Sequence, residues 1–305
     1  MIDKIWNKYA NLIFGSIFIL LTIFSFIKNL GINYIVYNVA LAIAAFTIKP
    51  DLVKETKLKD FLITLIPVLT VLFFAQKYGY QVWGKVIKWE TALGLGWNWN
   101  DLFKNIPFND AAFTRLFQAK WLNEFFKIVY NNGFILPVVL PIYRAIMCKD
   151  TKKIIRYALS GHLLQIFLIS PFYATIRLQE VWYVLGHADR LQRNFTPLQA
   201  AGWTLNCFPS MHTSIAFAMF LVALHEKDKI FKWFLCAFCL SVIYSTMYME
   251  IHWIIDVVAG VIFAAITVKL VDILLDFIEN KIAHSKKKIK VNYLYCNPEQ
   301  KIKMH

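Results

Sequence analysis

Long runs of apolar residues, separated by shorter polar and charged segments, dominate the chain. Each run approaches the roughly 20 residues that an α-helix needs to cross the hydrocarbon of a bilayer. We expect helices at 11–27, 31–48, 61–76, 155–176, 209–224, 233–249 and 253–275. A further helix over about 125–147 should be kinked at Pro137 and Pro141, because proline removes a helical hydrogen bond. The pattern therefore predicts an all-α polytopic membrane bundle with six to eight transmembrane helices.

The polar segments between these runs predict how the chain is divided and oriented. With a cytoplasmic N-terminus and eight crossings, the basic loops 49–60 and 148–156 and the lysine-rich tail lie inside, as short basic loops do. Six crossings, with an early helix pair re-entrant or interfacial, are the alternative. We divide the chain into N-terminal helices with an aromatic-rich interfacial loop (1–126), a helical core (127–280) and a basic tail (281–305).

Composition supports this class and argues against others. Of the 305 residues, 58% are hydrophobic and only 17% are charged, which is unlike a soluble domain. The net charge is +14, and the basic residues lie between and after the apolar runs. Basic residues at such positions set the orientation of membrane helices and attract lipid headgroups, so nucleic-acid binding is not expected. Cys236 and Cys239 form a CxxC within an apolar helix, where they are typical of small hydrophobic residues. We expect no metal and no cofactor.

His252 and Asp256 are the first candidate catalytic pair. Their i, i+4 spacing places both side chains on one helix face. An aspartate within an apolar run costs about 2.5–3.5 kcal/mol on insertion scales, which makes it a candidate functional residue. A carboxylate that accepts a hydrogen bond from one imidazole nitrogen fixes the tautomer, so that the other nitrogen can act as a base or nucleophile. A histidine at a helix end beside a packing aspartate is the structural alternative.

The second candidate element is Pro209-Ser210-Met211-His212, which directly precedes an uncharged run. Proline suits the first turn of a helix, and the free N–H groups there, with the Ser210 hydroxyl, favour anion binding. His212 would lie beside a bound anion. The two intervening helices form an antiparallel pair, so His212 and His252 are expected at the same membrane face, together with Arg177.

These residues resemble a known family. Pro209–His212, followed by Ser245-Thr246, His252 and Asp256, resembles the second and third signatures of the type-2 phosphatidic acid phosphatase superfamily. The stretch 244–248, with His252 and residues 256–260, is more narrowly similar to the inositol phosphorylceramide synthase branch. The resemblance implies a catalytic core of this type within 127–280 and a phosphohistidine intermediate on His252. It also implies His212 as general acid and Asp256 as the group that orients His252.

The same resemblance implies a phosphate site formed by Ser210, Ser245 and Thr246. Two departures weaken it: Thr246 stands where the superfamily usually has arginine, and the usual first signature has no clean match. Arg177 is our preferred substitute cation, ahead of Arg190 and Arg193. Because a phosphomonoester carries about −1.5 to −2 charges and a diester only one, fewer cations would favour diester substrates.

The sequence therefore predicts a membrane lipid phosphatase or phosphotransferase that acts on a lipid phosphate or phospholipid. A phosphodiester headgroup transferase of the inositol phosphorylceramide synthase kind is the alternative within the family. Outside it, a proton-coupled lipid transporter or an intramembrane serine protease that uses Ser210 would also need buried polar residues. We expect an integral protein of the plasma membrane or an equivalent membrane, with its site on the non-cytoplasmic face. The oligomeric state is left open.

Overall fold

The computed structural model describes residues 2–94, 96–205 and 207–296 and shows an all-α membrane protein. These residues form two compact units, up to Val268 and from Lys269 onward, and the second unit is the continuation of one helix. The longer helices are α1 (Ile2–Ile27), α2 (Ile32–Phe46), α3 (Leu58–Leu93), α5 (Lys120–Asn132), α6 (Leu136–Met147), α7 (Thr151–Ala158), α8 (Leu164–Thr175), α11 (Met211–Ala223), α12 (Lys229–Tyr248) and α13 (Ile254–Cys296). The short elements are η1 (Lys49–Asp51), β1 (Trp97–Asn98), α4 (Asn100–Lys104), η2 (Ala112–Arg115), the π-helical η3 (Leu159–Leu163), β2 (Ile176–Arg177), α9 (Val181–Leu185) and α10 (Pro197–Trp203).

Five helices in the described part of the chain are long and apolar enough to cross a membrane, and the bent pair α5–α6 makes a sixth. The pair bends by 58° over residues 133–135, so a kink is present, but it lies before both prolines: Pro137 is in the first turn of α6 and Pro141 is inside this helix. Two shorter apolar helices, α2 and α11, account for the remaining predicted runs. α3 extends to Leu93, well beyond the predicted end at 76, because residues 77–93 contain no proline to stop it.

Helix α11 lies at the centre of the bundle. Its residues are apolar on every side, as expected for a fully enclosed helix, and Ile215, Ala216, Ala218 and Met219 are completely buried. The small alanines allow α12 and α6 to approach closely. The N-terminus of α11 is thereby held at a fixed place in the bundle.

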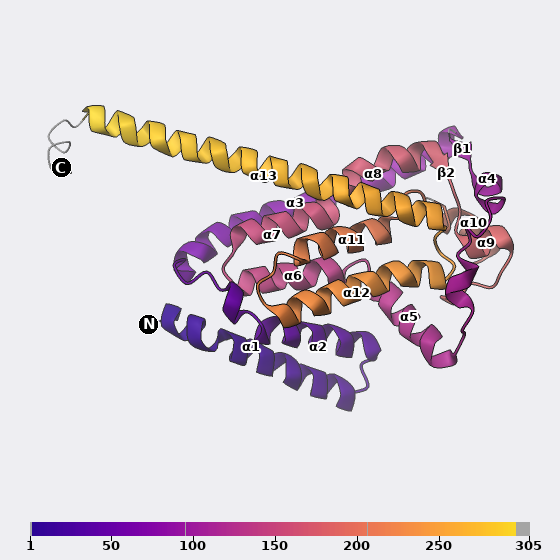
Figure 1. Cartoon of the computed structure of the whole chain (residues 1–305), viewed down its shortest axis with the longest axis horizontal. Helices are drawn as coiled ribbons and strands as arrows, with labels where there is room; N and C mark the ends of the chain where they lie inside the picture. Colours follow the sequence, from indigo (N-terminus) through magenta and orange to yellow (C-terminus); the bar gives the residue numbers. More distant parts are fainter. Residues whose placement is uncertain (1, 95, 206, 297–305) are drawn as a thin grey trace. The chain divides into compact units, whose positions relative to one another are not determined.

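Short elements gather at the end of the bundle where α11 begins (Figure 1). Strands β1 and β2 pair in parallel, with Trp97 opposite Ile176 and Asn98 opposite Arg177. In this region Asn109 caps the start of α13: its carbonyl accepts from the Ile254 N–H at 2.9 Å and its side-chain oxygen from the Ile255 N–H at 3.1 Å. The aromatic-rich segment before α5 thus fixes the helix that carries Asp256.

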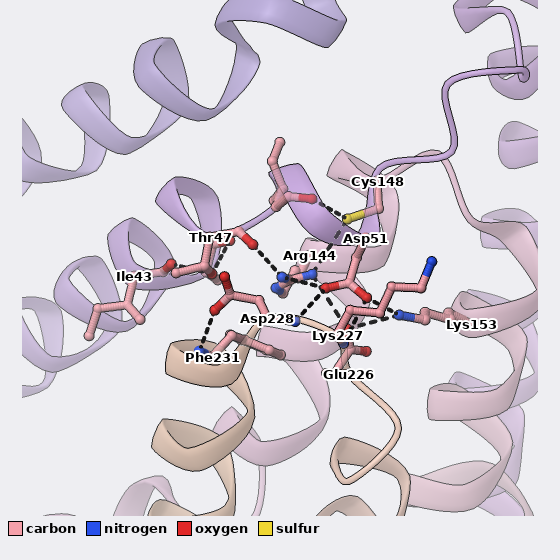
Figure 2. Close-up of polar contacts among 12 residues, drawn as sticks. Ile43, Thr47, Asp51, Arg144, Cys148, Lys153, Glu226, Lys227, Asp228 and Phe231 are labelled. Atoms are coloured by element: carbon pink, nitrogen blue, oxygen red, sulfur yellow. Dashed lines mark hydrogen bonds and ion pairs between the residues drawn. The ribbon is translucent and has the colours of Figure 1, made fainter.

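A buried ion-pair network lies beyond the opposite end of α11 (Figure 2). Arg144, which is 1% exposed, contacts Asp51 at 2.9 Å and Glu226 at 3.4 Å. Lys153 contacts the same two carboxylates at 3.1 and 2.8 Å. The two cations and two carboxylates balance in charge, and they join η1, α6, α7 and the α11–α12 turn. This network was not predicted from the sequence.

We expect the contribution of Asp51 to stability to disappear in acid. Burial by itself would raise the pKa of this carboxyl, but Arg144, the Lys227 N–H and Lys153 together lower it from 3.8 to about 2. The ionised form therefore stabilises the folded state above pH 3.8, and this stabilisation is lost as the pH falls through about 2. The difference in unfolding free energy between wild type and Asp51→Asn should shrink by about 2 kcal/mol over that range, measured by detergent-titration unfolding. A difference that does not vary with pH would contradict this role.

Candidate active site

His252 lies in the turn between α12 and α13, two residues before α13 begins. Its backbone N–H donates to the Thr246 carbonyl at 3.1 Å, which ties the turn to the last turn of α12. Its Nδ1 lies 3.1 Å from Oδ2 of Asp256, which is fully buried. The predicted contact is therefore present, but His252 lies in the turn before the helix and does not share a helix face with Asp256. Because Nδ1 is occupied by the carboxylate, Nε2 is the nitrogen available for chemistry.

Helix α13 approaches the start of α11 very closely, and Gly260 permits this approach. A Cβ on Gly260 would lie 2.7 Å from the Ser210 carbonyl oxygen, closer than side chains tolerate. The Ser210 N–H also donates to the Asp256 carbonyl at 3.0 Å. Glycine at this position thus allows the helix that carries Asp256 to dock on the turn that carries His212.

His212 lies in the first turn of α11 and faces His252. Ser210 caps the helix by accepting from the Thr213 N–H at 3.3 Å. The ring of His212 stacks on Tyr130 with centroids 4.5 Å apart and meets Phe134 edge-on at 5.2 Å. The centroids of His212 and His252 are 6.2 Å apart. Two imidazoles from different helices therefore share one site.

Both histidines line a cavity of about 1100 Å³. Its wall is mainly aromatic and apolar, and its charged lining residues among those described are Lys88, Glu180 and Arg193. A roomy apolar cavity with a few convergent polar groups is typical of a ligand site. The cavity is thus the candidate active site.

The other predicted phosphate ligands do not line this cavity in the described structure. Ser210 is fully buried, and its hydroxyl donates to Thr213 Oγ1 at 2.9 Å. Ser245 and Thr246 are also fully buried, and their hydroxyls donate to carbonyls one turn earlier in α12. Arg177 lies in β2, against Gly96. The structure thus brings together His212, His252 and Asp256, but places these four side chains outside the cavity lining.

Arg193 occupies the cavity wall where the sequence had favoured Arg177. Its guanidinium binds both carboxylate oxygens of Glu180 and, through Nε, Asp189 at 2.8 Å. Burial opposes its charge, but these hydrogen bonds outweigh burial and raise the pKa of Arg193. It is therefore a fixed cation whose single charge is more than neutralised by two carboxylates.

Comparison with known proteins places these residues in a family. The sequence profile described as the PAP2 superfamily matches residues 116–276, more than half of the chain, and this range includes both histidines and Asp256. The chain belongs to the PAP2 superfamily. Members of this superfamily are phosphatases or phosphotransferases.

A curated relative adds no activity to this assignment. An uncharacterized protein of Methanocaldococcus jannaschii is 27% identical over 200 residues, which cover 62% of this chain and 78% of that protein. No solved structure gives a significant match. The PAP2 assignment is thus the finding that bears on chemistry.

A potential metal-ligand group lies inside this PAP2 site. Ligand atoms of Cys207, His252 and Asp256 lie within 4.8 Å of one another. Burial raises the pKa of the Cys207 thiol well above its usual range, and the thiol contacts the Thr204 carbonyl at 3.5 Å. Because the thiolate is the form that binds metals, this group fits a metal poorly. The Asp256 carboxylate instead hydrogen-bonds His252.

A second cluster, not anticipated from the sequence, holds the turn that carries His252. Glu250 is 3% exposed and has a left-handed φ of 59°. Its carboxylate contacts Arg115 Nε at 3.0 Å, His187 Nδ1 at 3.0 Å and Arg190 Nε at 3.2 Å. Its carbonyl accepts from the Trp182 N–H at 3.0 Å. The sequence feature that could have pointed to this cluster is Glu250 itself, an acidic residue two positions before the candidate catalytic His252.

Proposed function

We propose that this protein transfers a phosphoryl or phosphodiester group of a membrane lipid through a phosphohistidine intermediate on His252. The observation that carries the proposal is the facing pair of imidazoles in one cavity, with buried Asp256 on Nδ1 of His252. The two rings, with centroids 6.2 Å apart, both line the cavity, so one phosphate group can contact both. Superfamily membership supports the reaction class.

The chemistry follows from this arrangement. Nε2 of His252 forms a bond to phosphorus while the bond from phosphorus to the lipid oxygen breaks, and His212 gives its proton to that departing oxygen. Asp256 stabilises the positive charge that develops on His252, as a buried carboxylate does for an imidazolium. An acceptor hydroxyl then attacks phosphorus, its proton passes to His212 and the nitrogen–phosphorus bond breaks. Water as acceptor gives hydrolysis, and a lipid hydroxyl gives transfer.

The charge around the cavity favours a diester substrate. Arg193 is already paired with Glu180 and Asp189, which leaves exposed Lys88 as the other cation in the described lining. A phosphodiester carries one negative charge and needs less compensation than a monoester with about −1.5 to −2. This supports a headgroup transferase, in agreement with the resemblance to the inositol phosphorylceramide synthase branch. In this proposal Arg193, not Arg177, is the arginine of the cavity wall, and two carboxylates already neutralise its charge.

Product analysis tests this function. The purified protein is incubated separately with phosphatidic acid and with phosphatidylinositol plus ceramide, and the products are identified by mass spectrometry. Diacylglycerol with inorganic phosphate indicates a phosphatase, whereas diacylglycerol with inositol phosphorylceramide indicates the transferase that we favour. Rapid quenching at alkaline pH should trap an acid-labile phosphoryl group on the peptide that contains His252. Absence of turnover with both lipids, or a trapped group elsewhere, would refute the proposal.

Glu250→Ala is expected to lower kcat by about tenfold to a hundredfold, with a smaller change in KM. Removal of the carboxylate leaves Arg115 and Arg190 without their shared anion and frees the turn that positions His252; misplacement of a reacting group by about 1 Å can cost 10²-fold. Steady-state kinetics in mixed micelles measure the effect. Glu250→Gln, which keeps two hydrogen-bonding groups, should lie between wild type and alanine. Equal activity of all three proteins would exclude a positioning role.

The location of this chemistry in the cell is a separate proposal. The several apolar helices support an integral membrane protein. The plasma membrane and a site on its non-cytoplasmic face stay predictions from the loop charges. On this orientation the lipid enters sideways from the outer leaflet.

A further inference from the structure

Beside the candidate active site lies a second cavity of about 670 Å³, formed by α3, α6 and η3. Its lining is apolar apart from Gln76 and His162. It lies among helices that are long and apolar enough to cross the membrane. Volumes of roughly 300–1,000 Å³ are typical of ligand pockets. We call it the tail groove.

Phe134 lies in the wall that the tail groove shares with the active-site cavity, because it lines both. Its ring meets the His212 ring at 5.2 Å on one side and stacks on His162 at 5.1 Å on the other. The tail groove is therefore next to the space in which His212 would contact a phosphate. The active-site cavity has the charged lining residues and the two facing histidines, whereas the tail groove is apolar apart from Gln76 and His162.

Two irregular helical segments border the tail groove. The α5–α6 break leaves the Phe134 carbonyl outside helical bonding, and His162 Nε2 donates to it at 2.7 Å. His162 itself lies in the π-helical segment η3, a type of distortion that is frequent at functional sites. Irregular backbone at membrane depth is tolerated where it is buried in protein or lines a cavity. Both irregularities thus shape one space next to the reacting histidines.

We propose that the tail groove binds one acyl chain of the lipid whose phosphate reacts at His252. This inference rests on the proposed function and narrows its substrate class to lipids with at least one long chain. The chain lies along α3 and α6, past Phe134, while the phosphate lies between the two histidines. Long-chain substrates then gain binding that short-chain analogues lack, because each buried methylene adds to the apolar area removed from water.

Two variants isolate the tail groove. Val139 lines it from α6 and is 42% exposed, so Val139→Trp fills the space without removing a core side chain. Val71 on α3 is 66% exposed and outside the lining, so Val71→Trp is the matched control. Activity is measured with dipalmitoyl and dihexanoyl forms of phosphatidic acid and of phosphatidylinositol with ceramide.

Val139→Trp should lower kcat/KM for the dipalmitoyl lipid by about tenfold or more and change the dihexanoyl value by less than about twofold. Val71→Trp should change neither. Equal losses of kcat/KM with both chain lengths, or no loss, would contradict the binding of an acyl chain in the tail groove. A dipalmitoyl phosphatidic acid with a diazirine at one chain end supplies a readout without turnover: crosslinks should map to residues of the groove lining. If the wild type turns over no lipid, the proposed function fails. Crosslinking alone then tests whether the tail groove binds an acyl chain, and labelling of other residues would reject this binding.

Discussion

Replacement of His252 by alanine is expected to abolish lipid turnover, with a loss on the order of 10⁴-fold or more in kcat. The variant removes the imidazole that Asp256 orients, so no nucleophile faces phosphorus. Losses of this order follow removal of a nucleophile from other enzymes with covalent intermediates. Turnover of labelled phosphatidic acid and phosphatidylinositol, with trapping of the phosphorylated peptide, measures it.

His225→Ala is the matched control for this variant. His225 is exposed at the far end of α11, and its ring contacts only the Leu221 carbonyl in the described structure, at 3.2 Å. It should retain full activity. Both variants should elute as monodisperse species in detergent with melting temperatures near that of wild type. A His252→Ala protein that is folded and still active would remove the phosphohistidine mechanism. A folded but inactive His225→Ala protein would show that the loss in His252→Ala is not specific to the site.

Arg144→Leu is expected to destabilise the folded protein by about 3–5 kcal/mol. The change leaves Asp51 and Glu226, each 5% exposed or less, with Lys153 as the cation that contacts both, and an uncompensated buried charge carries a cost of this size. It also removes the stacking of the guanidinium on Phe231, 4.5 Å from the ring centroid. Detergent-titration unfolding in mixed micelles, with circular dichroism as readout, measures the loss.

Lys153→Met provides the comparison within the same network. Its side chain is 25% exposed, so water can partly replace it and the loss should be clearly smaller than for Arg144→Leu. The double variant Asp51→Asn, Arg144→Leu should recover part of the stability, because one cation and one carboxylate are removed together and Lys153 still pairs with Glu226 at 2.8 Å. Equal losses for the two single variants, or no recovery in the double one, would show that the network does not act through charge.

The sequence by itself determined the membrane class and the core of the site. Apolar runs predict crossing helices because the bilayer excludes unsatisfied backbone groups. The short spacing predicts the contact of His252 with Asp256, which the structure makes between the turn before α13 and its first turn. Ser210 was predicted to hold an anion, whereas in the structure it caps α11. The superfamily could be named because its motifs are short and local.

Only the tertiary structure decided which distant charges meet. Arg144 and Asp51 are 93 positions apart, and Arg190 and Glu250 are 60 apart, so no periodicity in the sequence pairs them. The sequence favoured Arg177 over Arg193, yet of these two only Arg193 lines the cavity in the described structure. The position of a loop cation depends on how the loop folds back over the bundle. That path is set by contacts between distant segments, such as Asn109 with the start of α13.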